Sequence, residues 1–235
     1  MGVTVGVVLG AGAGRRVAGG VNKVLLRIGG EPIIVRSARA LAASPSVDEL
    51  VVVAAPSEVS LCGSLLAKSG IHAKVISGGA TRHGSEWAAL RHLERDICEG
   101  RIEIVVIHDA ARPFFPSERL TELIDAARVH RGALFGLPTD GCVARVQEGR
   151  ISRRLAASDV WAAQTPQAFH ADTLLQAYRR AAEEGFEGTD TSSTVERLGV
   201  RPLLLRGDPV NIKVTYAEDI VILEGLWEYR RRRTR

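Results

Sequence analysis

Short apolar runs rich in β-branched residues alternate with segments of helical periodicity along most of the chain. The pattern predicts strands over residues 3–9, 50–54, 72–76, 102–107 and 133–137, and helices over residues 32–43, 58–68, 85–97 and 116–130. Such alternation is typical of βαβ units and predicts the α/β fold class with a doubly wound, mostly parallel sheet. Ligands of these sheets bind at the carboxyl ends of the strands, so the loops after Leu9, Ile76, Ile107 and Leu137 are expected to share one edge.

The alternation is interrupted after residue 139. Residues 143–155 alternate apolar and polar positions around Glu148-Gly149, which predicts a β-hairpin. An isolated two-stranded arm is marginal in water, so the insertion at about residues 139–163 is expected to pack against a second subunit. A helix over residues 170–184, strands over 203–206 and 211–215 and a helix from 217 then complete one domain, 1–229, before a basic tail at 230–235.

The positive charge of the chain is concentrated at its C-terminus. The formal net charge is +4, and without the five arginines of residues 230–235 it would be −1. Aromatic residues make up only 5% of the chain, which disfavours stacking on nucleic-acid bases and favours a solvated tail. No apolar run reaches 18 residues and no basic leader precedes the first strand, so a cytoplasmic protein is predicted. Cys62, Cys98 and Cys142 lack disulfide or zinc spacing and are expected to be inert thiols.

The first strand runs directly into a glycine-rich turn. Gly10, Gly12 and Gly14 let backbone N–H groups approach an anion closely, and Arg16 and Lys23 bring positive charge to it. The spacing fits neither the dinucleotide-binding G-x-G-x-x-G pattern nor a Walker loop, which ends in Gly-Lys-Ser/Thr. The sequence therefore favours a polyphosphate cradle, with an ordinary strand-to-helix turn as the structural alternative.

An acid and a base follow the apolar run at residues 102–107. The segment reads His108-Asp109-Ala110-Ala111-Arg112-Pro113-Phe114. Asp109 is a candidate ligand for a divalent cation beside a polyphosphate, because Mg²⁺ takes one or two carboxylates together with phosphate oxygens. The structural alternative is a local ion pair between Asp109 and Arg112 that shapes the loop.

Other segments carry weaker signals. The glycine pair at 78–79 leaves space for a flat heterocycle against the backbone, and Ser85 is a candidate N-cap of the next helix. Lys213 lies on the expected strand 211–215 and is predicted to face away from the core. Turns and helix caps explain the hydroxyl-rich segments 164–167 and 188–191 without a function.

Taken in order, these motifs resemble the 2-C-methyl-D-erythritol 4-phosphate cytidylyltransferase family and its close polyol-phosphate cytidylyltransferase relatives. The motifs are the G-x-G-R-R loop with Lys23, GG-x-x-R-x-x-S, HDAARPF, QTPQ-x-F, T-D-x-x-S and NIKVT. The resemblance covers nearly the whole chain and implies a Rossmann-like nucleotidyltransferase fold with a protruding β-arm. It implies transfer of CMP from CTP to methylerythritol phosphate with release of pyrophosphate, in isoprenoid precursor synthesis. Mg²⁺ as the cofactor and a homodimer formed through the arm are further expectations.

The resemblance also implies roles for individual residues. Arg16 and Lys23 are expected to stabilise the charge of the transition state and leaving group, and Lys213 to hold the α-phosphate or the incoming phosphate. Asp109 is expected to lie beside the metal and the substrate. This arrangement suits phosphoryl transfer, because positioning and charge supply most of the rate of that reaction. The remaining expected contacts are to the nucleotide from Leu9, Gly10, Ala11, Gly12, Gly14, Gly79, Ala80, Ser85 and Ala110, and to the acceptor from Arg112, Thr165 and Thr189.

Three positions depart from the family pattern. Ala80 stands where an acidic residue is common beside the cytosine, Gly141 where a threonine is expected near the substrate, and Ala157 where an arginine of the arm reaches the acceptor phosphate. Arg153 and Arg154 are candidates to reach that phosphate instead. The alternatives are another polyol-phosphate or phosphonate acceptor, a non-catalytic nucleotide-binding paralogue, and nucleic-acid binding through the arginine tail.

Overall fold

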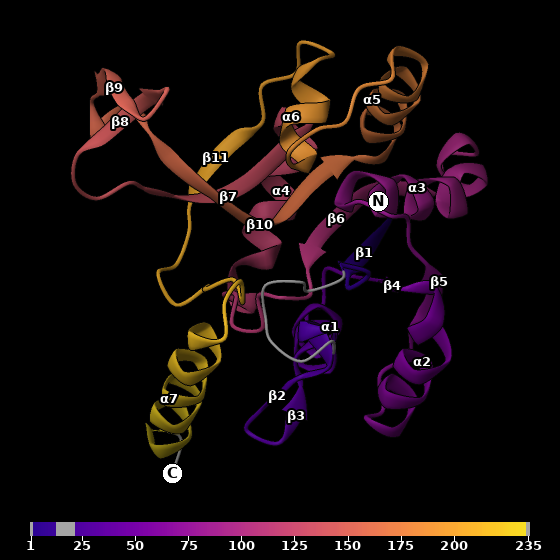
Figure 1. Cartoon of the computed structure of the whole chain (residues 1–235). Coiled ribbons are helices and arrows are strands. Elements are labelled where there is room, and N and C mark those ends of the chain that lie inside the picture. Colours follow the sequence, from indigo (N-terminus) through magenta and orange to yellow (C-terminus); the bar gives the residue numbers. More distant parts are fainter. Residues whose placement is uncertain (1, 13–21, 234–235) are drawn as a thin grey trace.

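A computed structural model describes residues 2–12 and 22–233, and a mixed, mostly parallel sheet of seven strands forms its centre (Figure 1). The strands follow the order β11-β7-β10-β6-β1-β4-β5. Neighbouring strands are parallel except at β10, which runs antiparallel to both β6 and β7. The α/β prediction is confirmed. The strand bounds are β1 (Val3–Leu9), β4 (Glu49–Ala54), β5 (Lys74–Ser77), β6 (Ile102–Asp109), β7 (Gly132–Pro138), β10 (Trp161–His170) and β11 (Leu203–Arg206).

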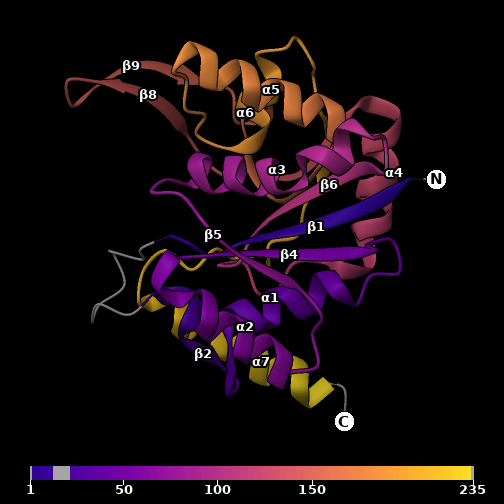
Figure 2. The same cartoon turned by 90° about the vertical axis from the view of Figure 1, so that its right-hand side faces the viewer.

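Helices cover both faces of the sheet (Figure 2). Leu41 of α1, Leu66 of α2 and Leu123 of α4 belong to the core on one face, whereas Leu90 of α3 and Leu174 of α5 belong to the core on the other. The central strands are apolar because both of their faces are covered, and residues 104–107 of β6 are completely buried. The helix bounds are α1 (Ile33–Ala42), α2 (Val59–Lys68), α3 (Arg82–Cys98), α4 (Leu120–His130), α5 (Ala171–Glu184), α6 (Thr191–Glu196) and α7 (Glu218–Arg233).

Two predictions about strands are wrong. Residues 211–215 form no strand, and their backbone is irregular. Conversely, residues 164–167, interpreted above as a turn, lie inside β10, in the middle of the sheet. The register of β10 against β7 shifts between Ala163 and Gln167, which is where a strand tolerates Pro166. Proline and polar residues at this interruption hide the strand from a search for alternating apolar positions.

The predicted hairpin is confirmed as a separate two-stranded sheet of β8 (Val143–Gln147) and β9 (Arg150–Leu155). Glu148 and Gly149 connect the strands with positive φ angles of 50° and 77°, as tight hairpin turns require. The arm extends away from the body in both views (Figures 1 and 2). Val146 and Ile151 are each 57% exposed on it. The domain boundaries stay a prediction.

The C-terminal arginines differ from the expected frayed tail, since α7 continues through Arg233. The helix is ordered because it docks on the small hairpin of β2 (Arg27–Ile28) and β3 (Glu31–Pro32). Leu223 and Trp227 of α7 pack with Ile28, and the backbone N–H of Gly29 donates to the Glu224 carboxylate. Residues 230–233 are therefore the last turn of a packed helix.

Two further sequence expectations concern membranes and cysteines. Within residues 2–12 and 22–233, every helix is too short or too polar to span a bilayer. The prediction of a cytoplasmic protein stays a prediction. All three cysteines are free, as expected. Burial raises the pKa of the Cys62 thiol to about 11, so this thiol stays protonated and unreactive.

Candidate active site

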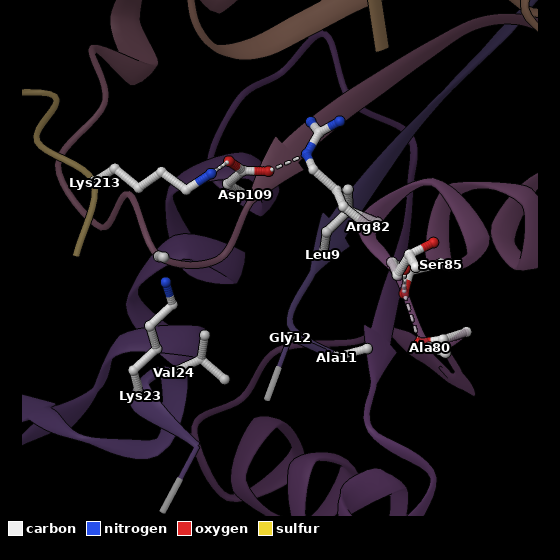
Figure 3. Close-up of a pocket in the computed structure, with 13 residues that line it drawn as sticks. Leu9, Ala11, Gly12, Lys23, Val24, Ala80, Arg82, Ser85, Asp109 and Lys213 are labelled. Carbon is white, nitrogen blue, oxygen red and sulfur yellow. Dashed lines mark hydrogen bonds and ion pairs between the residues drawn. The ribbon is translucent and has the colours of Figure 1, made fainter. Parts of the chain in front are cut away.

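The carboxyl ends of β1, β5 and β6 open into one pocket (Figure 3). Its two sides differ in chemistry. We call Leu9, Ala11, Gly12, Gly79, Ala80 and Ser85 the nucleotide wall, after the contacts that the sequence predicts for them, and Lys23, Arg82, Asp109 and Lys213 the charged wall. Three of the four residues expected to converge on the site, Lys23, Asp109 and Lys213, thus line the same pocket. The fourth, Arg16, lies outside the described residues, as does Gly14.

The nucleotide wall is built by backbone that approaches backbone closely. A Cβ added to Gly79 would lie 2.7 Å from the carbonyl carbon of Gly84, in the first turn of α3. Thr81 is the N-cap of α3, and its hydroxyl accepts the Gly84 N–H at 3.0 Å. Ser85 is therefore not the N-cap: it lies one turn inside the helix, and its hydroxyl donates to the Thr81 carbonyl at 2.9 Å. The wall leaves a smooth, small-residue surface beside the helix N-terminus.

Two expected nucleotide contacts lie behind this wall. The Gly10 N–H donates to the Val53 carbonyl at 2.7 Å, and the Gly10 carbonyl accepts from the Asn22 amide. Ala110 is completely buried, and its N–H donates to the Leu9 carbonyl at 3.0 Å. The neighbour Ala111 lines the pocket instead. Gly10 and Ala110 therefore do not line the pocket, but their backbone hydrogen bonds hold the neighbouring strand ends in place.

Lys23 is held on the charged wall by the residue before it. Asn22 is the N-cap of the short 3-10 helix Lys23–Leu25, and its amide nitrogen donates to the carbonyl of Gly10 and to the Glu58 carboxylate. This fastens the Lys23 turn to the end of β1. The Lys23 ammonium donates to the Val214 carbonyl at 2.7 Å and points to the side where Asp109 and Lys213 meet (Figure 3).

Asp109 lies between two cations at the end of β6. Its Oδ1 accepts from Arg82 Nε at 3.0 Å, and its Oδ2 accepts from Lys213 Nζ at 2.5 Å (Figure 3). Burial alone would raise the pKa of Asp109, but the charges of Arg82 and Lys213 hold it well below its usual range. Lys213 lies on the irregular segment 211–215 and not on the predicted strand, and its side chain lines the pocket, where the resemblance places it.

Arg112 does not form the local salt bridge with Asp109 that was the structural alternative to a functional role. The Arg112 guanidinium donates to the Asn211 carbonyl at 2.6 Å. Asn211 in turn donates its side-chain amide to the Thr165 carbonyl at 2.9 Å. Arg112 therefore ties the loop after β6 to the segment that carries Lys213.

A buried hydrogen-bond chain beneath Asp109 fixes the end of β6. The Asp109 N–H donates to the Thr165 hydroxyl at 3.0 Å, and the Thr165 oxygen lies 3.1 Å from His108 Nδ1. His108 Nε2 lies 3.0 Å from the Arg112 carbonyl, which can only accept, so the proton belongs on Nε2 and Nδ1 accepts from Thr165. Burial lowers the pKa of His108 to about 3 and keeps its ring neutral.

Arg82 connects this wall to a second buried carboxylate. Its NH1 donates to Glu86 Oε1 at 2.8 Å, while the Tyr178 hydroxyl donates to Glu86 Oε2 at 2.6 Å. The Thr191 hydroxyl also donates to Oε1. Burial lowers the pKa of Arg82, but Asp109 and Glu86 outweigh that effect and raise it. Burial raises the pKa of Glu86 above its usual value, although Arg82 and the two hydroxyls oppose this. Sequence reasoning quoted Arg82 only as part of a motif and missed Glu86, although their i,i+4 spacing was the available signal.

A smaller second pocket adjoins the first across Arg82, Asp109 and Lys213. It contains the three residues expected on the acceptor side. These are Arg112, Thr165 and Thr189, and the rest of the pocket is lined by Ala163, Gln164, Gln167 and Asp190. Asp190 caps α6 by accepting the Ser193 N–H, which confirms the cap interpreted from the sequence. Two pockets that share one carboxylate can hold two substrates side by side.

Two of the departures from the family pattern have a structural context. Gly141 has φ +86°, a backbone conformation that a threonine rarely adopts. Ala157 begins a short 3-10 helix after β9 and is half-buried. Ala80 lines the nucleotide wall without adding charge.

The donor set near Asp109 fits a divalent cation that takes most of its ligands from substrate. No group of three or more His, Cys, Asp or Glu side chains suited to a metal exists in the described part of the chain. Asp109 is ionised and offers hard oxygen atoms at the boundary of both pockets. Mg²⁺ is commonly bound in this way, through one or two carboxylates, waters and substrate phosphates.

The sequence of this chain matches known proteins over nearly its full length. A family model described as 2-C-methyl-D-erythritol 4-phosphate cytidylyltransferase matches residues 4–228. The protein of that name from Symbiobacterium thermophilum is 37% identical over 223 residues, which are 94% of this chain and 92% of the relative. The one from Shouchella clausii is 36% identical over 227 residues, covering 95% and 96%.

Solved structures agree with the sequence comparison. A 2-C-methyl-D-erythritol 4-phosphate cytidylyltransferase from Thermus thermophilus superimposes with a TM-score of 0.73 at 26% identity, covering 96% of this chain and 98% of that one. A 4-diphosphocytidyl-2C-methyl-D-erythritol synthase from Anaerococcus prevotii shares the fold with a TM-score of 0.84 at 21% identity, covering 97% and 96%.

Proposed function

Because the chain belongs to the 2-C-methyl-D-erythritol 4-phosphate cytidylyltransferase family, it is an enzyme that moves CMP from CTP to 2-C-methyl-D-erythritol 4-phosphate, and we propose that the two adjoining pockets form its active site. The reaction releases pyrophosphate and belongs to isoprenoid precursor synthesis. The observation that carries the site is the position of Lys23, Arg82 and Lys213 around the single ionised carboxylate of Asp109.

In the proposed reaction, an oxygen of the acceptor phosphate attacks the α-phosphorus of CTP. A new P–O bond forms as the bond to the β-phosphate oxygen breaks, and the electron pair leaves with pyrophosphate. The cytosine and ribose lie against the nucleotide wall, where Gly79 and Ser85 leave room and the start of α3 offers backbone N–H groups. Lys23 and Lys213 stabilise the charge that spreads over the phosphoryl oxygens.

Asp109 is the residue proposed to hold a divalent cation, and Mg²⁺ is the ion that its environment suits. When bound, the cation supplies charge neutralisation to the triphosphate. Lys213 and Arg82 keep the carboxyl ionised in the absence of substrate, so that it is ready to accept a cation. Arg16 is proposed to assist Lys23, and its position is outside the described residues.

The acceptor is proposed to lie in the second pocket. Arg112 and Thr189 line it and are the candidates to contact the acceptor phosphate and hydroxyls. The Thr165 hydroxyl donates a hydrogen bond to His108 and accepts one from the Asp109 N–H. We therefore assign Thr165 mainly to orienting Asp109. Arg153 and Arg154 on the arm are candidates to replace the guanidinium expected at position 157.

The test of the function is pyrophosphate release. With CTP, Mg²⁺ and 2-C-methyl-D-erythritol 4-phosphate, we expect stoichiometric pyrophosphate and a cytidine-diphospho product identified by mass spectrometry. Ribitol 5-phosphate and a phosphonate alcohol serve as competing acceptors. Release only with one of these would refute the assigned acceptor. CTP binding by calorimetry without release on any acceptor would instead support the non-catalytic paralogue.

We further propose that the arm formed by residues 143–155 mediates a homodimer. It exposes Val146 and Ile151, and an isolated hairpin of this kind gains stability from a partner. Ile151→Asp is therefore expected to lower the mass measured by light scattering from that of a dimer toward that of a monomer. Leu61→Asp, a matched change of an exposed apolar residue on α2, leaves the mass unchanged. A wild-type monomer would contradict the proposal.

A further inference from the structure

Glu86 is a buried charge next to the active site that the proposed chemistry does not use. Its side chain is 1% exposed, although the residue belongs to a helix whose other face meets solvent. Both carboxylate oxygens accept hydrogen bonds, from Arg82, Tyr178 and Thr191. Burial raises the pKa of Glu86, but these three donors, one of them a guanidinium, stabilise its ionised form. Burying such a charge is costly, so it needs a compensating interaction.

That interaction is with Arg82, which lies between two carboxylates. Arg82 Nε donates to Asp109 at 3.0 Å, and Arg82 NH1 donates to Glu86 at 2.8 Å. On its other oxygen Asp109 accepts from Lys213. Two cations and two carboxylates thus alternate in the order Glu86, Arg82, Asp109, Lys213. Without the charge of Glu86, the remaining three groups would carry one net positive charge at the junction of the two pockets.

Such an excess would act on the two ligands of the site in opposite ways. The nucleotide is strongly anionic, so a more positive pocket would bind it more tightly. A divalent cation at Asp109 would be repelled, and Arg82 would pair with Asp109 alone. A charge on Glu86 that cancels that of Arg82 avoids both effects. The geometry allows this because Glu86 contacts Arg82 and lies outside both pockets, behind them.

We propose that Glu86 is a positioning and charge-balancing residue that acts through Arg82 and keeps Asp109 available to a divalent cation. The proposal rests on the function and site proposed above. Tyr178 and Thr191 serve it by fixing the two oxygens of Glu86, and Thr191 also begins α6, the helix directly after Thr189. Glu86 thereby connects the nucleotide and acceptor sides without touching either substrate.

The test compares Glu86→Gln with wild type in two binding experiments that need no turnover. The dissociation constant of CTP is measured by calorimetry in EDTA, and that of Mn²⁺ by electron paramagnetic resonance on the CTP-saturated enzyme without acceptor. For one added positive charge we expect CTP to bind about three- to tenfold more tightly and Mn²⁺ about three- to tenfold more weakly. Glu86→Asp, which keeps the charge, should return both constants toward wild type.

The opposite signs distinguish charge balance from a structural role. If Glu86 had only a structural role, Glu86→Gln would weaken the binding of both CTP and Mn²⁺ or change neither. Either result in a folded Glu86→Gln protein would overturn the proposal. Glu94→Gln, which removes a carboxylate from an exposed ion pair with Arg179 on the same helix, is the control and should leave both constants unchanged. Failure of the proposed function would appear separately, as a lack of pyrophosphate release with normal binding shifts.

A second variant covers the case in which Glu86→Gln does not fold. Arg82→Gln combined with Glu86→Gln removes both members of the buried pair and leaves the local net charge as it is in the wild type. We expect its Mn²⁺ dissociation constant to stay within about threefold of wild type. A much larger rise would show that Glu86 does not act by cancelling the charge of Arg82, and would overturn the proposal.

Discussion

The nucleotide wall and the charged wall face the same pocket but differ in the residues that form them. The nucleotide wall consists of small residues and close backbone, with Gly79 packed against the first turn of α3. The charged wall consists of long side chains held by ion pairs, with Asp109 between Arg82 and Lys213. We therefore expect the first wall to select by shape and the second to act by charge. Each should fail under a different kind of substitution.

The largest effect is expected from removing a cation of the charged wall. Lys23→Ala deletes an ammonium that points to the meeting point of Asp109 and Lys213. We expect kcat to fall by roughly 10²-fold or more, as for other preorganised groups that stabilise developing charge. The KM for CTP should change less than kcat, because the charge concerned develops in the transition state. Steady-state pyrophosphate release measures both constants.

The control for this prediction is Lys68→Ala, which removes an exposed lysine from the last turn of α2, away from the pocket. Its kinetic constants should match those of wild type. Unchanged turnover in Lys23→Ala would refute the catalytic role of this wall. A rise in KM alone would reduce Lys23 to a binding residue and would remove the contrast between the two walls.

A change of shape in the nucleotide wall should affect the binding of CTP rather than kcat. In Gly79→Ala the new Cβ would approach the backbone of Gly84 to 2.7 Å, so the loop or the start of α3 must move. Overpacking of this kind costs about 1–3 kcal/mol, and we expect the CTP dissociation constant to rise by about tenfold or more. Calorimetric titration with CTP measures it directly.

Gly63→Ala is the matched control, because this glycine lies in α2 and the nearest atom to an added Cβ is 3.9 Å away. It should bind CTP as wild type does and gain slightly in stability, since alanine favours a helix. If Gly79→Ala bound CTP normally but lost turnover, the two walls would not divide shape from charge in the way described.

The two walls also differ in how far the sequence predicts them. The nucleotide wall follows from local patterns, because each of its segments is a turn directly after a strand of the parallel sheet. The charged wall depends on contacts between distant segments: Asp109 lies 104 residues from Lys213 and 27 from Arg82. Periodicity places Lys213 on a strand facing outward, and only the irregular backbone of 211–215 turns it inward.

The same limit explains the errors in the fold. The parallel strands β1, β4 and β6 were recognisable because continuous apolar runs are expected in a doubly covered sheet. Strand β10 was missed, since Gln164, Thr165 and Pro166 break its pattern at the position where it supports the proposed active site. The helix from residue 217 is predicted, but its continuation through residues 230–233 is not, because the sequence does not show the packing of α7 against β2 and β3. Functional and long-range constraints thus override local preference here.

The smallest expected effect concerns His108, which supports the charged wall, and it appears in the free energy of unfolding. His108 is buried and neutral with a pKa of about 3, whereas in the unfolded chain its pKa is near 6.5. Between these values the unfolded state binds a proton that the folded state does not, so stability falls as the pH falls below about 6.5. From pH 7.5 to pH 5.5 this single group should reduce the free energy of unfolding by about 1.4 kcal/mol.

Urea unfolding at the two pH values measures this loss, and His108→Asn isolates it. The variant is less stable at both pH values because it disrupts the contacts to Thr165 and the Arg112 carbonyl, but its loss between pH 7.5 and 5.5 should be smaller than that of wild type by about 1.4 kcal/mol. His130→Gln, at an exposed position in α4, should keep the wild-type dependence. Asp109 does not interfere, because its depressed pKa confines its contribution to pH values below about 4. An identical pH dependence in His108→Asn and wild type would mean that the His108 ring is not held neutral beneath Asp109. The charged wall would then lack the rigid support that distinguishes it from the nucleotide wall.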